Sequence, residues 1–335
     1  MSRSFLGRIF FSQVKGYNIQ MALSVVLVSF NSEKELRTFF PSVYHGVRKE
    51  VDSAEFILID NHSVDRGIDF VRETYPDVRI RLEEENLYFG PAANNGIAQA
   101  RNDLVLLLNP DVGIERLNFS AIEDMFVARS RLFAVHPDIS DPRTGEAERK
   151  FRLGMRRGNV DIMESNPDGA AEGMEIPFAT GGAVFLRRSL FLQLGGFDPL
   201  FVPFYWEDVD LGVRAMRCGL ENRYFSGSVF CHAHSTIIRR HHADREIKEV
   251  YERNRLFFFY KHVSFLSRPF LAHIFFLFPR LFFSRLKDRS FLDGFYLCFQ
   301  KGGRIASARR EIRRRRFPIS FAQVIRRFRG FVPNE

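Results

Sequence analysis

Apolar and polar residues alternate in blocks along the first third of the chain. Near-continuous apolar runs occur at 23–30, 55–60 and 104–108, and a further short strand is expected at 78–82. Runs of this length without polar alternation are typical of strands that are buried on both faces, as in a parallel sheet. The stretches between these runs have helical patterns, one of them at 91–100. Strands that alternate with helices at short spacing predict an α/β fold with a Rossmann-like, mostly parallel sheet flanked by helices.

Polar side chains follow the predicted strands at the point where each strand ends. These residues are Ser29 and Asn31, Asp60 and Asn61, and Asn109 and Asp111. Ligands of open α/β sheets bind outside the carboxyl ends of the strands. The polar strand ends therefore predict a ligand-binding edge of the sheet.

A second concentration of polar groups lies between 178 and 217. Three aromatic residues are followed at once by three acids, in the order Phe204, Tyr205, Trp206, Glu207, Asp208 and, after one residue, Asp210. Carboxylates are costly to bury without partners, so such a cluster predicts a cleft that holds a cation or moves a proton. A helical pattern begins here, and its N-terminal dipole favours negative charge. The alternative is that Asp208 and Asp210 only cap this helix.

The amino-acid composition is most informative near the C-terminus. The chain has 335 residues, a net charge of +9 and 38 Phe, and Lys and Arg crowd the segment 301–329, where Glu311 is the acidic residue. Such a basic segment predicts an anionic partner. The three Cys are widely spaced and form no CxxC pair, which fits a reducing cytoplasm. No run of 18 apolar residues occurs, so no ordinary spanning helix is expected.

The aromatic segment after residue 261 has helical spacing. One apolar face is predicted to contain Phe270, Leu271, Ile274, Phe275, Phe278, Leu281 and Phe282. With its basic flanks, this pattern indicates helices that lie on an anionic membrane surface, peripheral to the inner face of the cell membrane. The alternative is that the helices pack on the preceding domain and leave a solvated basic tail. We therefore predict an extension at 1–20, a catalytic domain at 21–261 and a helical membrane-associating appendage at 262–335.

Seven motifs, in order, resemble those of the inverting family-two glycosyltransferases. They read VVLVSFNS, ILIDNHSVD, ENLYFGPAANNGI, LLLNPDV, TGGAVFLRR, LGGFDPLF and FYWEDVDLGVR, and they cover roughly 23–261. The series looks most like the rhamnosyltransferase branch that builds bacterial surface polysaccharides. The resemblance implies the GT-A fold, a nucleotide-sugar donor and a lipid-linked glycan acceptor. It implies dTDP-L-rhamnose as the donor, with a UDP-sugar as the alternative.

The resemblance also implies the nucleotide and metal sites. Asp60 is expected to bind the pyrimidine ring. Asn109 and Asp111 correspond to the family's variant DxD motif, so that Asp111, supported by Asn109, would hold Mg²⁺ or Mn²⁺ against the diphosphate. His232 is expected to complete the metal shell. The alternatives are ordinary turns at Asp60 and at Asn109–Asp111, and a structural role for His232.

The remaining assignments concern the sugar donor and the acceptor. Asn86 and Asn94 match the donor-side motif, in which Tyr88 stands where the family has Gly; a helix cap is the alternative for Asn94. Glu207 and Asp208 match the family's acidic pair. Inverting transfer needs one general base, and we assign that role to Asp208, with Glu207 holding the acceptor or the base. The acceptor and sugar pocket is expected to contain Gly181, Gly182, Asp198 and Trp206.

Two other classes of protein are less consistent with the sequence. A nucleotidyltransferase would need a Gly-rich, basic phosphate loop near the first strand, and VSFNSEKEL is not such a loop. A non-catalytic membrane or nucleic-acid-binding protein would explain the basic tail. It would leave the pairs Asn109 and Asp111, and Glu207 and Asp208, unexplained. The tail has no recognised nucleic-acid motif, and we expect no nucleic-acid partner.

Overall fold

The computed structural model describes residues 21–145, 150–156, 158–165, 172–233, 236–265, 267–286 and 289–328. The predicted extension at 1–20 lies outside the described residues.

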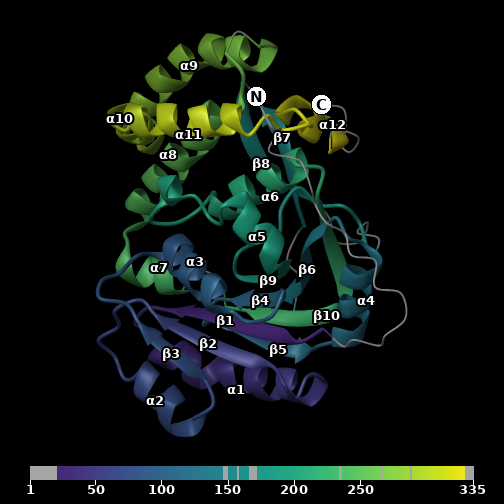
Figure 1. Ribbon diagram of the computed structural model, residues 1–335. Helices are drawn as coiled ribbons and strands as arrows, with labels where there is room; N and C mark the ends of the chain where they lie inside the picture. The colour runs from purple at the N-terminus through teal and green to yellow at the C-terminus, as the bar shows by residue number, and fades with distance from the viewer. Residues whose placement is uncertain are drawn as a thin grey trace.

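A central eight-stranded sheet has the order β3-β2-β1-β4-β9-β6-β10-β5 (Figure 1). Its strands are β1 (Leu23–Ser29), β2 (Glu55–Asp60), β3 (Arg79–Leu82), β4 (Leu104–Leu108), β5 (Val112–Arg116), β6 (Leu132–Ser140), β9 (Ala183–Arg187) and β10 (Glu221–His232). The pairs β2–β3, β1–β2, β1–β4 and β6–β10 are parallel, whereas β9 and β5 run antiparallel to their neighbours. The predicted mostly parallel sheet is confirmed, and the antiparallel strands β5 and β9 make it a mixed sheet.

The apolar runs form the strands β1, β2 and β4, which are buried on both faces, whereas the edge strand β3 is partly exposed. Along β1, Leu23, Val25 and Leu27 face one core, while Val26 and Val28 face the other, because side chains alternate along a strand. This double burial explains why the runs show no polar alternation.

Helices cover both faces of the sheet. The first core is covered by α1 (Glu33–Glu50), α2 (Gly67–Thr74) and α4 (Phe119–Ala128). The second core is covered by α3 (Phe89–Gln99), α5 (Arg188–Leu194) and α6 (Glu207–Arg217). The helix α6 begins at the acidic pair, as the sequence predicts.

A third core joins α6 to the C-terminal helices. The elements around it are the hairpin β7 (Lys150–Arg156) and β8 (Asn159–Ser165), the 3₁₀ turn η2 (Pro199–Phe201), α8 (Asp244–His262), α9 (Arg268–Leu286), α10 (Ser290–Gln300), α11 (Gly302–Arg314) and α12 (Phe321–Arg327). The short helix α7 (Thr236–His241) precedes α8. Trp206 and Val209 pack in this core with Phe257 and Phe258 of α8 and with Phe321 of α12. The helix α8 therefore connects α6 to the C-terminal helices.

The apolar face predicted for α9 is largely open. Phe275 and Phe278 are 73% and 72% exposed, whereas Leu277 and His273 are buried. Across the parts of the chain that the structure describes, no helix combines the length and apolarity that crossing a bilayer requires.

Candidate active site

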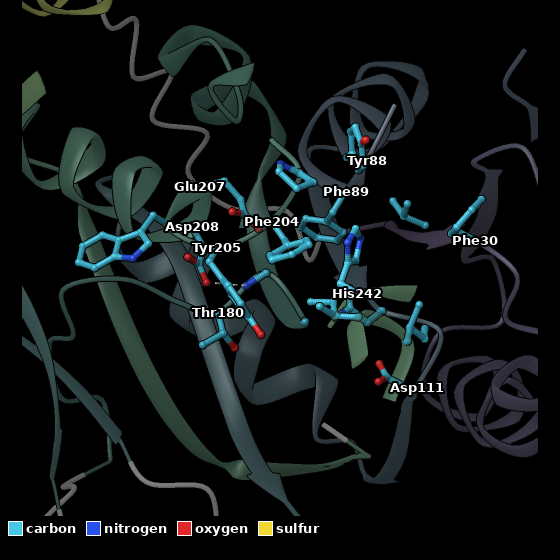
Figure 2. A pocket seen from close by; sticks show the side chains of 18 of the residues that line it. Phe30, Tyr88, Phe89, Asp111, Thr180, Phe204, Tyr205, Glu207, Asp208 and His242 are labelled. Atoms are coloured by element: carbon cyan, nitrogen blue, oxygen red, sulfur yellow. Dashed lines mark hydrogen bonds between the residues drawn. The ribbon is translucent and has the colours of Figure 1, made fainter. Parts of the chain in front are cut away.

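A pocket of about 510 Å³ lies at the carboxyl ends of the parallel strands (Figure 2). Val28 at the end of β1, Asn61 after β2 and Asn109 after β4 line it. This is the edge where open α/β sheets bind ligands. The predicted residues that line the pocket are Asn86, Asn109, Asp111, Gly181, Gly182, Trp206, Glu207, Asp208 and His232.

Figure 2 shows Glu207 and Asp208 on one side of the pocket and Asp111 on the other, with aromatic rings between them. The pocket therefore has one acidic wall near the start of α6 and a second acidic group near the end of β4. Two separated acids can serve two different chemical tasks.

The acidic wall follows a sharp turn of the chain. Tyr205 and Trp206 have left-handed backbones, with φ of 71° and 75°, which is costly for residues with bulky side chains. Asn254 of α8 holds this turn, because its Nδ2 donates to the carbonyls of Phe201 at 2.6 Å and of Tyr205 at 2.9 Å. Asn254 was not among the residues predicted from the sequence. Its signal there is a lone amide in the aromatic-rich segment 251–260.

Asp208 is held by backbone donors. The amide of Val209 donates to Oδ1 at 2.7 Å and the amide of Gly181 donates to Oδ2 at 3.3 Å. Burial raises the pKa of Asp208 to about 6, against the lowering effect of these hydrogen bonds. A carboxylate with a pKa near the working pH is suited to general-base catalysis.

Glu207 differs from its neighbour. Burial, and then the charge of Asp208, hold the pKa of Glu207 well above its ordinary value. Among the described residues, neither Oε2 of Glu207 nor Nε1 of Trp206 has a hydrogen-bond partner, although both atoms are buried. Because both residues line the pocket, their polar atoms can bind a substrate.

Asp210 belongs to a buried ion network behind the acidic wall. Its Oδ1 lies 2.6 Å from Nζ of Lys261 and 2.8 Å from Nε2 of His262, and its Oδ2 accepts from Nε of Arg214 at 2.7 Å. Burial raises the pKa of Asp210, but the charges of Lys261 and Arg214 outweigh it, so that the pKa lies well below its ordinary value. Asp198 pairs with the same Lys261 at 2.6 Å and does not line the pocket.

The opposite wall contains the predicted metal ligands. Nε2 of His232 and Oδ1 of Asp111 lie 3.2 Å apart on two adjacent strand ends. A Cβ added at Gly182 would lie 3.2 Å from the His232 ring and 3.4 Å from the Asn109 amide, so glycine leaves room beside these donors.

These residues fit a divalent cation that a ligand helps to hold. The described residues include no group of three or more His, Cys, Asp or Glu that could bind a metal by themselves. Mg²⁺ is often bound by one or two carboxylates together with substrate phosphates and water. One carboxylate and one imidazole beside an open pocket match this pattern.

Asn86 belongs to a network of amides at the pocket edge. Its Oδ1 accepts from Nδ2 of Asn61 at 2.9 Å and from the amide of Tyr88 at 2.9 Å. Asn61, one of the polar strand-end residues predicted from the sequence, lines the pocket. Tyr88 lines the pocket with φ of 62° and ψ of 176°, a backbone conformation that favours glycine. The backbone conformation agrees with the family's use of Gly at this position.

Four predicted nucleotide-site residues do not line the pocket. Asp60 accepts from the amide of Ser63 at 3.2 Å, and Oδ1 of Asn31 accepts from the amide of Val64 at 2.8 Å, so both brace the loop after β2. Asn94 exchanges two hydrogen bonds with the backbone of Phe197, at 2.8 and 2.9 Å. Ser29 has a buried Oγ that lacks a hydrogen-bond partner within the described part of the chain.

The helix α7 covers part of the pocket. Ile237, Ile238 and His241 line it, and Arg240 pairs with Glu35 of α1 at 2.5 Å. Nothing in the sequence pattern indicated this long-range pair.

Two similarities at the level of sequence bear on this site. The model of Glycosyl transferase family 2 matches residues 24–195. The N-acetylglucosaminyl-diphospho-decaprenol L-rhamnosyltransferase of Mycobacterium tuberculosis is 30% identical over 241 residues, which cover 64% of this chain and 77% of that protein.

Among solved structures, a mannosyltransferase from Pyrobaculum calidifontis in complex with GDP-Man and Mn²⁺ matches with a TM-score of 0.50 and 14% identity over 94% of this chain and 88% of its own. GalNAc-T7 with UDP, GalNAc and Mn²⁺ matches with a TM-score of 0.56 and 15% identity over 73% of this chain and 49% of its own. The chain therefore belongs to glycosyl transferase family 2, has the GT-A fold and is a glycosyltransferase.

Proposed function

We propose that the enzyme transfers L-rhamnose from dTDP-rhamnose to a hydroxyl of a lipid-linked glycan, with inversion at the anomeric carbon. The observation that carries this proposal is the pocket with Asp208 on one wall and the pair Asp111 and His232 on the other. The rhamnose and the lipid-linked acceptor are supported by the 30% identity to a rhamnosyltransferase whose name specifies such an acceptor. A UDP-sugar donor is the alternative.

The proposed reaction is a single displacement. Asp208 takes the proton of the acceptor hydroxyl as the oxygen attacks the anomeric carbon and the bond to the diphosphate breaks. Glu207, held neutral by burial, donates a hydrogen bond that positions the acceptor. The backbone amides of Gly181 and Val209 keep the Asp208 carboxylate oriented.

The metal site serves the leaving group. Asp111 and His232, with Asn109 beside them, would hold Mg²⁺ or Mn²⁺. When bound, the cation neutralises the charge of the diphosphate as it leaves, so no protein acid is required. Gly181 and Gly182 allow the sugar and the acceptor to approach the backbone closely, and Trp206 supplies an indole N–H next to the acidic wall.

We also propose that the enzyme works on the cytoplasmic face of the cell membrane as a peripheral protein. The outer face of α9 supports this placement, since Phe275, Phe278 and Phe282 are each more than half exposed. Exposed aromatic side chains of this kind, beside basic helices, fit an anionic membrane interface.

Thermal-shift measurements with dTDP, UDP, GDP and CMP, each with and without Mn²⁺, test the donor assignment. A ligand that binds only the folded enzyme raises its unfolding temperature. We expect the largest Mn²⁺-dependent stabilisation with dTDP. A larger response to UDP would replace the donor and keep the mechanism, and no response to any nucleotide would contradict the proposal.

A further inference from the structure

A second pocket of about 640 Å³ lies among the C-terminal helices, separate from the candidate active site. Tyr260 of α8, Phe295 and Phe299 of α10, and Ile305 of α11 form much of its wall. Its volume is in the range of about 300–1,000 Å³ that is typical of ligand sites. A wall of this composition can hold a hydrocarbon chain.

Three arginines of α11 line the same pocket. They are Arg309, Arg310 and Arg313, and no Asp or Glu is among the described residues of the lining. Arg309 is only 8% exposed, and within the described part of the chain its Nε has no hydrogen-bond acceptor. Burial, and then the charge of Arg313, lower the pKa of Arg309. Its Nη1 donates to the carbonyls of Tyr260 and of Val263, the latter at 2.7 Å, and the guanidinium lies over the ring of Phe265. These contacts hold Arg309 in place, and its unused Nε together with the charges of Arg310 and Arg313 can bind an anion.

The opening of the pocket is apolar and accessible. Phe299 and Phe265 at its edge are 77% and 52% exposed. At Gly302, which also lines the pocket, an added Cβ would meet no atom within 4 Å. Large exposed aromatic rings next to a cationic pocket indicate an amphiphilic ligand, with an apolar chain and an anionic head.

The pocket is connected to the active site through one helix. Tyr251 of α8 lines the active-site pocket and Tyr260 of the same helix lines the second pocket. Nine residues of α-helix correspond to a rise of about 13 Å. Figure 1 shows α8 running from α7 towards α9, α10 and α11. Nine residues are about two and a half turns, so the two tyrosines project from opposite faces of α8, and the second pocket lies farther along this helix than the candidate active site.

We propose that this pocket binds an isoprenoid diphosphate, the lipid carrier of the glycan acceptor. The isoprenoid chain packs between α8, α10 and α11, and the diphosphate binds Arg309, Arg310 and Arg313. A diphosphate, with its higher charge and larger number of acceptor oxygens, matches three arginines better than the phosphodiester of a bulk phospholipid. This inference rests on the proposed function for the identity of the acceptor.

Calorimetric titration of the full chain with farnesyl diphosphate tests the pocket. We expect the double variant Arg310→Ala/Arg313→Ala to weaken binding at least tenfold. Ala306→Phe, which keeps every charge and fills the exposed opening, is expected to weaken it similarly. The matched control is Arg304→Ala/Arg314→Ala, which removes two exposed arginines of the same helix that do not line the pocket. This control should bind within twofold of the parent chain.

Three outcomes would overturn the inference. Inorganic pyrophosphate that binds as tightly as farnesyl diphosphate would leave only an anion site. Equal binding of dihexanoyl-phosphatidylglycerol would indicate a general phospholipid site, and an equal loss in the Arg304/Arg314 control would indicate adsorption to a basic surface.

The titration is paired with Mn²⁺-dependent dTDP binding of the same samples. Nucleotide binding without farnesyl diphosphate binding would refute this inference and leave the proposed function intact. Farnesyl diphosphate binding without any nucleotide binding would refute the proposed function instead.

Discussion

Asp208 should control the acid limb of the pH profile. With a pKa of about 6, roughly 90% of the carboxyl is ionised at pH 7 and roughly 10% at pH 5. A general base acts only when ionised, so kcat/KM should fall about tenfold between pH 7 and pH 5. Initial rates of dTDP release from dTDP-rhamnose, measured with acceptor lipid at both pH values, provide the assay. Nucleotide binding measured in parallel shows whether the donor site is unchanged.

Asp208→Asn should remove the base and lower kcat by about 10²- to 10⁴-fold. The same substitution should stabilise the fold near neutral pH. The folded pKa of about 6 exceeds the ordinary value of 3.8, so ionisation costs the folded state about 3 kcal/mol above pH 6 and almost nothing near pH 3. Chemical denaturation should therefore show a gain at pH 7.5 that falls to about a third at pH 4.5 and is lost near pH 3, reduced throughout by the loss of one acceptor for the backbone amides.

Glu207→Gln is the matched control. Because Glu207 is held neutral, the amide keeps a hydrogen-bond donor and adds no charge, so the acid limb near pH 6 should persist. The assignment of the base would be refuted if Asp208→Asn kept parental turnover, or if Glu207→Gln abolished the acid limb while Asp208→Asn retained it.

Three further predictions concern the surroundings of the site. Asn254→Ala should destabilise the fold by about 3 kcal/mol and lower kcat, because the backbone carbonyls of the Tyr205 turn lose their buried hydrogen-bond donor. Urea denaturation measures the loss of stability, and steady-state rates measure the change in kcat. Tyr88→Gly should raise the unfolding temperature, because glycine adopts without strain a backbone conformation that costs tyrosine about 1–3 kcal/mol. It should also raise KM for the donor, because the Tyr88 ring lines the pocket. Phe275→Ser/Phe278→Ser should reduce co-sedimentation with phosphatidylglycerol vesicles several-fold without changing nucleotide binding.

Each of these predictions has an outcome that contradicts it. If Asn254→Ala kept the stability of the parent chain, the Tyr205 turn would be stable without the Asn254 hydrogen bonds. A lower unfolding temperature of Tyr88→Gly would show that the Tyr88 backbone is unstrained. For the membrane face, Val127→Ser on α4 is the control, because Val127 is 66% exposed on a different surface. An equal loss of co-sedimentation in this control would show that α9 has no specific part in membrane binding.

The sequence predicts the fold well where burial alone decides the structure. The runs at β1, β2 and β4 contain almost only apolar residues, and strands buried on both faces require that pattern. The acidic start of α6 was predictable for a similar reason, since three acids next to aromatics need a helix terminus or a cleft.

The rest of the site depends on contacts that no local pattern encodes. Asp198 has the sequence context of a pocket residue, yet it pairs with Lys261, which lies 63 residues away. Asn94 likewise binds the backbone of Phe197, 103 residues along the chain. Asn254 binds Tyr205, 49 residues away along the chain, and Arg240 binds Glu35, 205 residues away. Such pairs are fixed only when the sheet and α8 bring the segments together.

The most direct test of the account compares two variants in one binding measurement. The unfolding temperature of the parent chain, Asp111→Ala and Asp208→Asn is measured with dTDP, with and without Mn²⁺. We predict Mn²⁺-dependent stabilisation of the parent and of Asp208→Asn, and its loss in Asp111→Ala, because the two acids lie on opposite walls and serve different steps. Retained stabilisation in Asp111→Ala, or its loss in Asp208→Asn, would contradict this division between a cation-binding wall and a base.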